Sequence, residues 1–291
     1  LVYGVQDVGT CTRFLDDWGM EKVEAGKTGA IYRTLENQLL TLRKLDDPGL
    51  PAAVEEGSTV REVVWGVDSD ESLANISAEL SRDREVIEHK DGSLHACDVL
   101  GIAIAFQVKD EAEFTDEVPV LNYRSHEPRL NRTMESTQEV RIRPYRIGHV
   151  VYNHAAEQRE KAVAFYTERL NFRVTDAVSG LGDFLRCDGS TYHHNWFLLH
   201  RGDKVRFNHA AFEVKDFEQI ILGGKYMRER GWNSSRNPGR HNLGSNLHWY
   251  FHSPLGGEVE YFSDMDRMDD NWKPRIWDKA PVIDFWKAEV L

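Results

Sequence analysis

The chain has 291 residues, of which 41% are hydrophobic and 29% charged, the composition of a globular protein that can bury a core without disulfide bonds. Its formal net charge of −12 argues against a nucleic-acid partner, because an acidic surface repels phosphate backbones. No apolar run approaches the roughly 20 residues that cross a bilayer, so no membrane partner is expected. The three cysteines are far apart and odd in number, which predicts free thiols in a reducing cytoplasm: Cys11, Cys97 and Cys187.

The first half of the chain predicts alternating strands and helices. After an initial strand comes a helix with four apolar residues on one face: Val8, Cys11, Phe14 and Leu15. Gly19 ends this helix, and alternating polar and apolar residues predict strands after it. A strand over residues 60–69 then leads into a helix over residues 71–83, and residues 95–106 complete this half.

The second half repeats this order. The segment that opens with GHVV predicts a strand, and the helix after it has four apolar residues on one face: Ala162, Phe165, Tyr166 and Leu170. Residues 207–216 match residues 60–69, and residues 252–262 match residues 95–106. One βαβββ-like unit is therefore expected twice, with a period of about 150 residues.

A polar segment without periodicity, residues 122–146, separates the two halves. It predicts a linker between an N-terminal domain, residues 1–121, and a C-terminal domain, residues 147–265. The tail, residues 266–291, is rich in charge and tryptophan, which predicts that it packs back on the body or covers an opening.

Histidine is distributed unevenly between the halves. Nine of the twelve histidines lie between His149 and His252. In the first half, Glu62 occupies the position of His209, Ala105 occupies that of Glu260, and Leu1 or a residue before it occupies that of His149. An excess confined to one copy of a duplicated unit predicts one retained metal site and one lost site.

Alternation along strands places candidate ligands on shared faces. Glu258 and Glu260 face the same side, as do His248, Tyr250 and His252. Two imidazoles and one carboxylate from three strands form a facial triad, which is diagnostic of non-haem Fe(II) oxygen chemistry. The other interpretation is a set of hydrogen-bonded core and surface histidines, and spacing alone leaves both open. For His248 and His252 we expect structural roles.

Four ordered motifs resemble the type I extradiol ring-cleaving dioxygenases of the vicinal oxygen chelate superfamily. They are GHVV with AVAFYTERLNFRV, then FLRCDGSTYHHNWF, FNHAAFEV, and GRH followed by PLGGEVEY. The resemblance covers about residues 1–265 and is sharp over residues 147–262. It implies an α+β fold of two domains, each made of paired βαβββ modules (glyoxalase-like barrel sheets), with metal in the C-terminal domain alone. The repeat is then a domain-level one.

By this resemblance the metal ligands are His149 in GHVV, His209 in FNHAAF and Glu260 in EVEY. The choice of Glu260 over Glu258 rests on the family pattern. The implied cofactor is Fe(II), and the same ligand set accepts Mn(II).

The resemblance also assigns catalytic residues. His194, second in the HH pair, matches the acid–base histidine, His241 in GRH matches a histidine that hydrogen-bonds substrate, and Tyr250 matches the tyrosine beside the substrate hydroxyl and the metal. Family members often carry Thr-Asn-Asp-His after GRH, where this chain has Asn-Leu-Gly-Ser at residues 242–245, and HHNWF replaces the common HHT. These departures point to an unusual ring substrate, and the tail faintly resembles members that act on trihydroxylated rings such as trihydroxytoluene.

The implied activity is insertion of both atoms of O2 into a catecholic or trihydroxylated ring, which opens next to the diol. The implied partners are a small aromatic diol, O2 and further copies of the chain in a homo-oligomer. One alternative is another metal-dependent enzyme of the superfamily, a glyoxalase-like lyase or a thiol transferase, although those chains are usually shorter and commonly have four protein ligands. Others are a non-catalytic ligand-binding protein, which would lack the ligands, and a scaffold, which leaves the histidine asymmetry unexplained.

Overall fold

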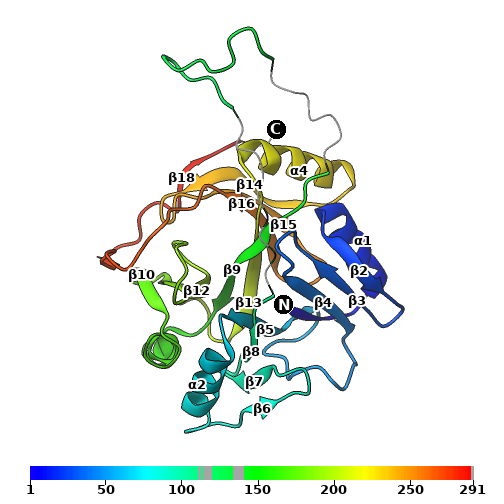
Figure 1. The fold of residues 1–291 in the computed structure, drawn as a ribbon, viewed down its shortest axis with the longest axis vertical. Coiled ribbons are helices and arrows are strands. Elements are labelled where there is room, and N and C mark those ends of the chain that lie inside the picture. Colours follow the sequence, from blue (N-terminus) through cyan, green and yellow to red (C-terminus); the bar gives the residue numbers. More distant parts are fainter. Residues whose placement is uncertain (111, 113, 115–119, 134–140, 290–291) are drawn as a thin grey trace.

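The computed structural model describes residues 1–110, 112, 114, 120–133 and 141–289. These residues form two mixed β-sheets with helices at their periphery (Figure 1). The N-terminal half builds one sheet and the C-terminal half builds the other.

The first half contains β1 (Val2–Val5), α1 (Val8–Trp18), β2 (Glu21–Ala25), β3 (Gly29–Arg33), β4 (Leu39–Lys44), β5 (Thr59–Val67), α2 (Asp70–Leu80), β6 (Ile87–Glu88), β7 (Leu94–Cys97) and β8 (Ala103–Val108). Its eight strands are ordered β2-β3-β4-β1-β5-β8-β7-β6.

The second half contains β9 (Arg146–Asn153), η1 (Ala156–Gln158), α3 (Arg159–Ala164), the π-helical turn η2 (Phe165–Arg169), β10 (Arg173–Val178), β11 (Gly182–Arg186), β12 (Trp196–Leu199), β13 (Arg206–Glu213), α4 (Phe217–Glu229), β14 (Ser234–His241), β15 (Leu247–His252), β16 (Glu258–Ser263), β17 (Arg275–Trp277) and β18 (Asp284–Lys287). Its ten strands are ordered β17-β10-β11-β12-β9-β13-β16-β15-β14-β18.

The two sheets share one topology. Adding eight to each strand number of the first sheet reproduces the order from β10 to β14 in the second sheet. Each sheet joins two βαβββ modules, β1 to β4 with β5 to β8 and β9 to β12 with β13 to β16. The α+β class with paired modules in each half is confirmed. The repeat pattern alone predicted one βαβββ unit in each half, and that number is wrong, because each half contains two such units. The prediction that the second half repeats the first is confirmed.

Helix α1 shows how local sequence sets the elements. The Asp7 side chain accepts a hydrogen bond from the Thr10 N–H and caps the first turn. Gly19 ends the helix in the left-handed conformation, with φ of 91°, as the sequence predicts. The apolar face expected from the sequence is buried against the first sheet.

One hydrophobic core runs through both halves. Trp18 of α1 stacks on Tyr261 of β16 with ring centroids 3.5 Å apart, and Trp65 of β5 lies edge-on to Trp196 of β12. Helix α4 packs closely on β15 at Gly224, where an added Cβ would lie 2.0 Å from the Trp249 ring. Because Trp18 and Tyr261, like Trp65 and Trp196, come from opposite halves, the two sheets bury each other's apolar surface.

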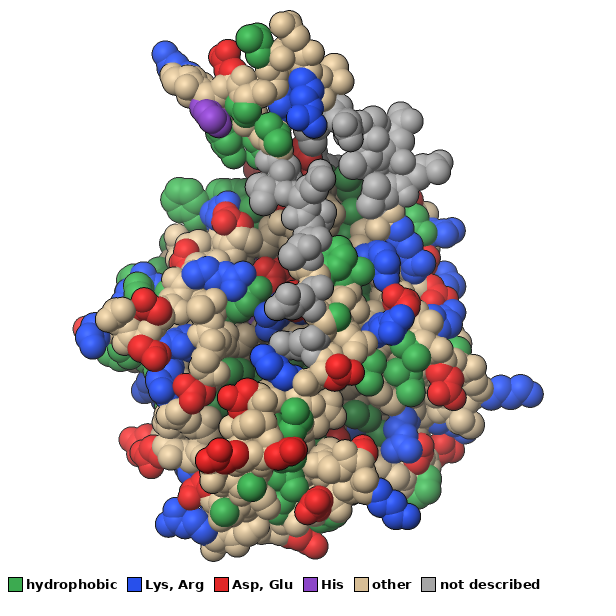
Figure 2. Space-filling model, in the orientation of Figure 1, with side chains coloured by type: hydrophobic (Ala, Val, Ile, Leu, Met, Phe, Trp, Pro, Cys, Tyr) green, Lys and Arg blue, Asp and Glu red, His purple; other side chains and the backbone are tan. Residues whose placement is uncertain are grey.

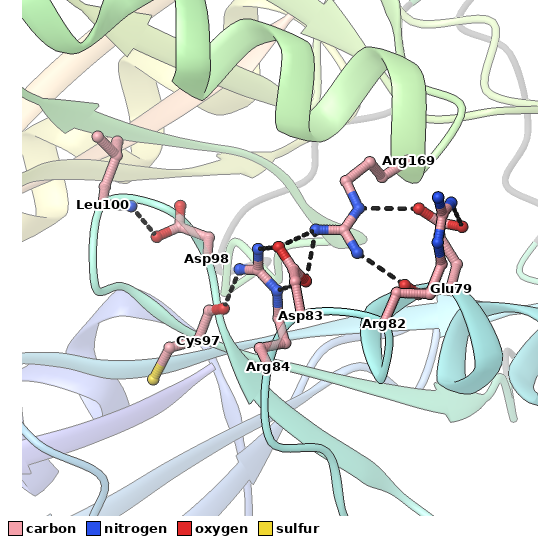
Figure 3. A network of polar contacts seen from close by, with 8 residues as sticks. All are labelled: Glu79, Arg82, Asp83, Arg84, Cys97, Asp98, Leu100 and Arg169. Carbon is pink, nitrogen blue, oxygen red and sulfur yellow. Dashed lines mark hydrogen bonds and ion pairs between the residues drawn. The ribbon is translucent and has the colours of Figure 1, made fainter.

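A polar network also joins the halves (Figure 3). Arg169 of η2 donates to the Glu79 carboxylate over 2.9 Å and to both oxygens of Asp83 over 2.8 and 2.9 Å. Hydrogen bonds from Arg84 and Arg169 lower the pKa of Asp83 to about 2. Nearby, the Tyr166 hydroxyl donates to Asp98 over 2.9 Å. Residues of η2 are therefore anchored to the end of α2 and to the loop after β7.

The tail returns to the body, as its tryptophans predict. Strand β17 pairs in parallel with β10, and β18 pairs antiparallel with β14. We propose that the boundary between domains 1–121 and 147–265 lies in the linker at 122–146. Residues 134–140 of that linker lie outside the described residues, as do 111, 113 and 115–119 of the first domain and 290–291 of the tail.

Residues 120–133 project away from both sheets in Figure 1. On the face drawn in Figure 2, acidic and basic side chains are interspersed, and histidine contributes very little of the surface. The three cysteines are free, as predicted. Among the residues that the structure describes, no helix has both the length and the apolarity of a membrane span.

Candidate metal centre

The strand register places three candidate ligands on one face. Strand β13 lies between β9 and β16, and its Ala211 pairs with His149 on one side and Glu260 on the other. His209 stands two residues from Ala211 and so faces the same way. Paired residues also project to one face, so all three side chains enter one buried space, called here the metal cup. The small side chain of Ala211 leaves room between them.

The ligand atoms lie close together. Nε2 of His149 is 3.1 Å from Oε2 of Glu260, Nε2 of His209 is 3.3 Å from the same oxygen, and the two nitrogens are 3.4 Å apart. Atoms held about 2.1 Å from one cation lie roughly 3.0–3.4 Å from one another. All three residues are at least 95% buried. The set therefore fits a single divalent metal.

The charge states also suit metal binding. Burial lowers the pKa of His209 to about 4, so its imidazole is neutral at neutral pH. Burial alone would raise the pKa of Glu260, but His149 and His209 hold it well below its usual range. Neutral imidazole and ionised carboxylate are the forms that coordinate metals.

Two asparagines orient the ligands. Asn246 donates to Oε1 of Glu260 over 3.0 Å, which leaves Oε2 for the metal. Oδ1 of Asn208 lies 2.7 Å from Nδ1 of His209, which places the proton on Nδ1 and leaves Nε2 free. Neither asparagine was predicted from the sequence. Asn208 could have been noticed as the neighbour of a ligand, whereas Asn246 lies in a loop with no periodicity.

The position next to His149 in the GHVV motif, Gly148, has no room for a side chain. A Cβ at this position would lie 2.2 Å from the Phe262 ring. That ring also packs 5.2 Å from the His149 ring, so it closes one side of the cup.

His194 lies in the segment between β11 and β12, with its ring 4.3 Å from the ring of His149. Burial lowers its pKa well below the usual histidine value. Nδ1 of His194 lies 3.0 Å from Nδ1 of His193, and Nε2 of His193 lies 2.6 Å from Oδ2 of Asp176. The Asp176 carboxylate can only accept, so Nε2–H of a neutral His193 donates to it. Nδ1 of His193 then accepts from Nδ1–H of His194. Nε2 of a neutral His194 therefore keeps its lone pair.

The tail holds Asp176 in place. Arg275 donates to both carboxylate oxygens over 2.8 and 2.6 Å, and Trp277 donates over 2.7 Å. Although burial acts to raise the pKa of Asp176, these bonds and that of His193 keep it below its usual value. His193, the first histidine of the HH pair, had no predicted role, and it connects a carboxylate held by the tail to His194.

His241 and Tyr250 lie on the other side of the cup. Tyr250 pairs with Glu260 across the strands, and its ring lies 5.2 Å from that of His209. Nε2 of His241 lies 2.9 Å from the Tyr250 hydroxyl. Burial raises the pKa of Tyr250 well above its usual value, so the phenol stays protonated.

The remaining candidates lie outside the ligand set. Glu258 accepts from Arg236 over 2.8 Å instead of joining the triad. His252 is exposed, and His248 is buried with Nε2 3.1 Å from Asp284. The structure thus brings His149, His194, His209 and Glu260 together, with Tyr250 beside them and His241 behind Tyr250.

The first sheet offers a contrast. Its register aligns Val2 with Val151, so the counterpart of His149 would precede Leu1. Glu62, in the position of His209, is bonded to His95 over 2.8 Å. Both of these side chains line a cavity of about 1560 Å³ that extends between the halves and reaches His149 but no other member of the triad. Among the described residues, the candidate metal groups lie in the second sheet.

Comparisons with known proteins agree with this arrangement. Residues 146–261 match the model of the Glyoxalase/Bleomycin resistance protein/Dioxygenase superfamily. Metapyrocatechase 2 from Cupriavidus necator is 31% identical over 130 residues, 45% of this chain and 40% of that protein. Metapyrocatechase from Pseudomonas sp. (strain CF600) is 25% identical over 126 residues, 42% of this chain and 40% of that protein. The chain thus matches about two-fifths of the length of these curated relatives.

Solved structures share the fold over nearly the whole chain. A Mn(II)-bound glyoxalase from Novosphingobium aromaticivorans has a TM-score of 0.75 at 21% identity, covering 98% of this chain and 88% of its own. The halotolerant catechol dioxygenase BphC has a TM-score of 0.74 at 16% identity, with 100% and 93% covered. The 2,3-dioxygenase LapB from Pseudomonas sp. KL28 has a TM-score of 0.73 at 15% identity, with 95% of each chain covered. At these identities the likeness is one of fold.

Proposed function

We propose that this chain is an extradiol ring-cleaving dioxygenase. Its C-terminal half matches the Glyoxalase/Bleomycin resistance protein/Dioxygenase superfamily. The reaction inserts both atoms of O2 into a catecholic or trihydroxylated ring and opens it next to the diol. The observation that carries the proposal is the buried triad of His149, His209 and Glu260 with the His194 ring beside it. The similarity to two metapyrocatechases supports it.

The proposed metal is Fe(II), with Mn(II) accepted by the same donors. Held by the triad, such a metal would supply Lewis acidity and the redox chemistry that lets O2 react with the diol. His149, His209 and Glu260 supply one negative charge and two neutral donors, which leaves the dication acidic enough to favour an ionised diol.

His194 is the proposed acid–base residue. Its Nδ1 is held by His193, so its Nε2 is the nitrogen free to exchange a proton with substrate. In this role it takes a proton from one diol hydroxyl and returns it as the ring opens. The Phe184 ring packs edge-on against the His194 ring, with the two centroids 5.1 Å apart.

Tyr250 and His241 are proposed to orient the diol from the opposite side. Their 2.9 Å hydrogen bond fixes the direction of the phenol oxygen beside Glu260 and His209. A fixed orientation of both diol oxygens lowers the entropy lost on reaching the reactive geometry.

A glyoxalase-like lyase is the second candidate. The specific observation in its favour is the Mn(II)-bound glyoxalase, which has the same fold at a TM-score of 0.75. A lyase of this kind would isomerise or add without consuming O2, so oxygen uptake separates the two.

The experiment is oxygen uptake by anaerobically purified, Fe(II)-loaded protein against a panel of catechols and trihydroxybenzenes, with absorbance scanned for a yellow ring-opened product. Uptake matched by product formation with a diol is expected. The Glu260→Ala variant, loaded in the same way, is the control for free iron. A wild-type protein that holds one metal per chain and consumes no O2 with any diol would overturn the proposal in favour of the lyase.

We also propose a homo-oligomer, which rests on the resemblance alone. Light scattering after size-exclusion chromatography measures the mass of the assembly, and a mass of 33.5 kDa would identify a monomer.

A further inference from the structure

Strand β18 of the tail places a carboxylate against His241. In the register of β14 and β18, His241 pairs with Asp284. Oδ1 of Asp284 lies 2.8 Å from Nδ1 of His241 and 3.1 Å from Nε2 of His248. The loop after His241, residues 242–246, contains no acidic residue, so the tail supplies the carboxylate that this part of the site otherwise lacks.

The cluster of His241, His248 and Asp284 has the composition of a metal site, with ligand atoms within 4.8 Å of one another. Its geometry opposes that reading. The two imidazole rings are stacked, with centroids 4.0 Å apart and planes 24° from parallel. A metal lies in the plane of each imidazole that binds it. Two nearly parallel ring planes at this separation do not meet close to both rings, so no one position suits a metal bound to both. In the triad, by contrast, the rings of His149 and His209 are 80° apart.

Hydrogen bonding explains the cluster instead. A carboxylate only accepts, so the His241 nitrogen that faces Asp284 carries a proton. The other nitrogen of a neutral His241 then has a lone pair, and it lies 2.9 Å from the Tyr250 hydroxyl. The Tyr250 hydroxyl, for which the Glu260 carboxylate is the other acceptor nearby, then donates to His241, and the lone pairs of its oxygen point away from that bond.

We propose that Asp284 is a positioning residue: it holds His241 in the Nδ1–H tautomer, so that the Tyr250 hydroxyl donates to His241 and its oxygen accepts a hydrogen bond from the substrate hydroxyl. This inference rests on the proposed function. It deepens that function by assigning a direction to each hydrogen bond and by making the tail part of the site.

The direction has a consequence for substrate choice. An accepting oxygen at Tyr250 favours a group that still carries a proton, such as an un-ionised ring hydroxyl, over an anionic or purely accepting substituent at the same place. The matching arrangement across the cup, Asp176 with His193 and His194, likewise leaves an accepting nitrogen. The two hydroxyl protons of a diol would thus each meet an acceptor.

The test is nitrogen NMR of the full metal-free chain with ring-labelled histidine, in which long-range proton–nitrogen correlations distinguish the two neutral tautomers and the imidazolium. The His241→Gln variant assigns the signal. The expected result in the wild type is a neutral Nδ1–H ring at neutral pH. A wild-type Nε2–H tautomer or imidazolium would overturn the proposal without any Asp284 variant.

Asp284→Leu removes the acceptor at similar volume, and Asp278→Leu is the matched control on an exposed tail residue. The His241 ring is expected to lose the Nδ1–H preference in the first variant alone, and Asp284→Asn, which keeps a carbonyl acceptor, is expected to restore it. An unchanged tautomer in folded Asp284→Leu would contradict the positioning role.

Activity supplies a separate readout. With a diol that the wild type cleaves, Asp284→Leu is expected to lower kcat/KM by about 10–100-fold, mainly through KM, at unchanged metal content. A wild type that cleaves no diol would defeat the proposed function while the NMR result still decides the role of Asp284. An active wild type with an equally active Asp284→Leu variant would defeat this inference alone.

Discussion

The amide nitrogen of Asn246 lies 3.0 Å from Oε1 of Glu260, and both side chains are completely buried. This bond holds the carboxylate so that its other oxygen faces His149 and His209. Asn246→Ala is expected to weaken metal binding by about 10–100-fold, because the ligand loses its orienting partner. Chelator competition measures the affinity, and Asn242→Ala in the same loop is the control. Equal affinities in the two variants would show that Glu260 needs no support from Asn246.

The two glutamates of β16 provide a direct test of the ligand assignment. Glu260→Ala is expected to abolish tight metal binding, because two neutral imidazoles alone hold a divalent metal poorly. Glu258→Ala, two residues away and bonded to Arg236 instead, is expected to keep its metal. Metal content per chain after dialysis is the measurement, and full content in Glu260→Ala would remove Glu260 from the ligand set.

The acid–base assignment predicts a loss of rate without a loss of binding. His194→Asn or His194→Phe is expected to keep metal and diol and to turn over about 10²–10⁴-fold more slowly. The exposed His252→Asn is the matched histidine control. Single-turnover kinetics with pre-bound diol would separate the steps, and wild-type turnover in both His194 variants would rule out the role.

The bond between His193 and Asp176 predicts a smaller effect of the same kind. Asp176→Asn can donate to His193 where the carboxylate only accepts, which disturbs the tautomer of His194. Turnover is expected to fall by about 10–100-fold with metal content unchanged. The control is Asp188→Asn, an exposed residue that follows β11. Turnover equal to that of the control would mean that His194 acts independently of Asp176.

Asp98 predicts a pH dependence of stability. Its pKa is raised to about 6 because burial outweighs its hydrogen bonds from Ile102, Tyr166 and Leu100. A folded pKa above the unfolded value of about 4 means that the folded chain keeps a proton that the unfolded chain releases, so stability falls as pH rises through this window. Relative to Asp98→Asn, the wild type is expected to lose up to about 3 kcal/mol between about pH 4 and pH 6 and nothing further above it.

Urea unfolding of both proteins from pH 4 to pH 8 measures this difference. Asp46→Asn, a change in an exposed ion pair with Lys44, is the control and is expected to show a flat difference. A flat difference for Asp98→Asn as well would mean that Asp98 has an ordinary pKa in the folded chain.

Much of the fold could be predicted from apolar periodicity and from self-similarity. The buried face of α1 and its end at Gly19 follow from local sequence, and the matching of Glu62 to His209 and Ala105 to Glu260 agrees with the strand registers. The two modules within each half could not be recognised as repeats from the pattern. Their strands share the two-residue alternation but few residue types. The register that aligns Val2 with Val151 required a β-bulge in each half, which residue spacing does not reveal.

Strand alternation narrowed the candidate ligands to a few faces, and the family resemblance chose among them, whereas the loops and the tail gave no such signal. His149, His209 and Glu260 come from three strands, but Glu258 has the same facing as Glu260, so alternation alone does not single out the triad. Asn246 and Asp284 reach the site from irregular segments, so only the folded chain places them beside Glu260 and His241. The Asn-Asp pair that family members often carry after GRH is absent from residues 242–245, yet Asn246, one residue later, donates to the ligand Glu260.

The two strands of the tail occupy the two ends of the ten-stranded sheet, with β17 beside β10 and β18 beside β14. Unpaired outer strands present rows of free N–H and C=O groups to which other chains can add. Removing residues 266–291 would therefore uncover two such rows at once and leave a protein prone to self-association. The segment that positions Asp284 and Arg275 thus also covers both edges of the sheet and so prevents self-association of the folded chain.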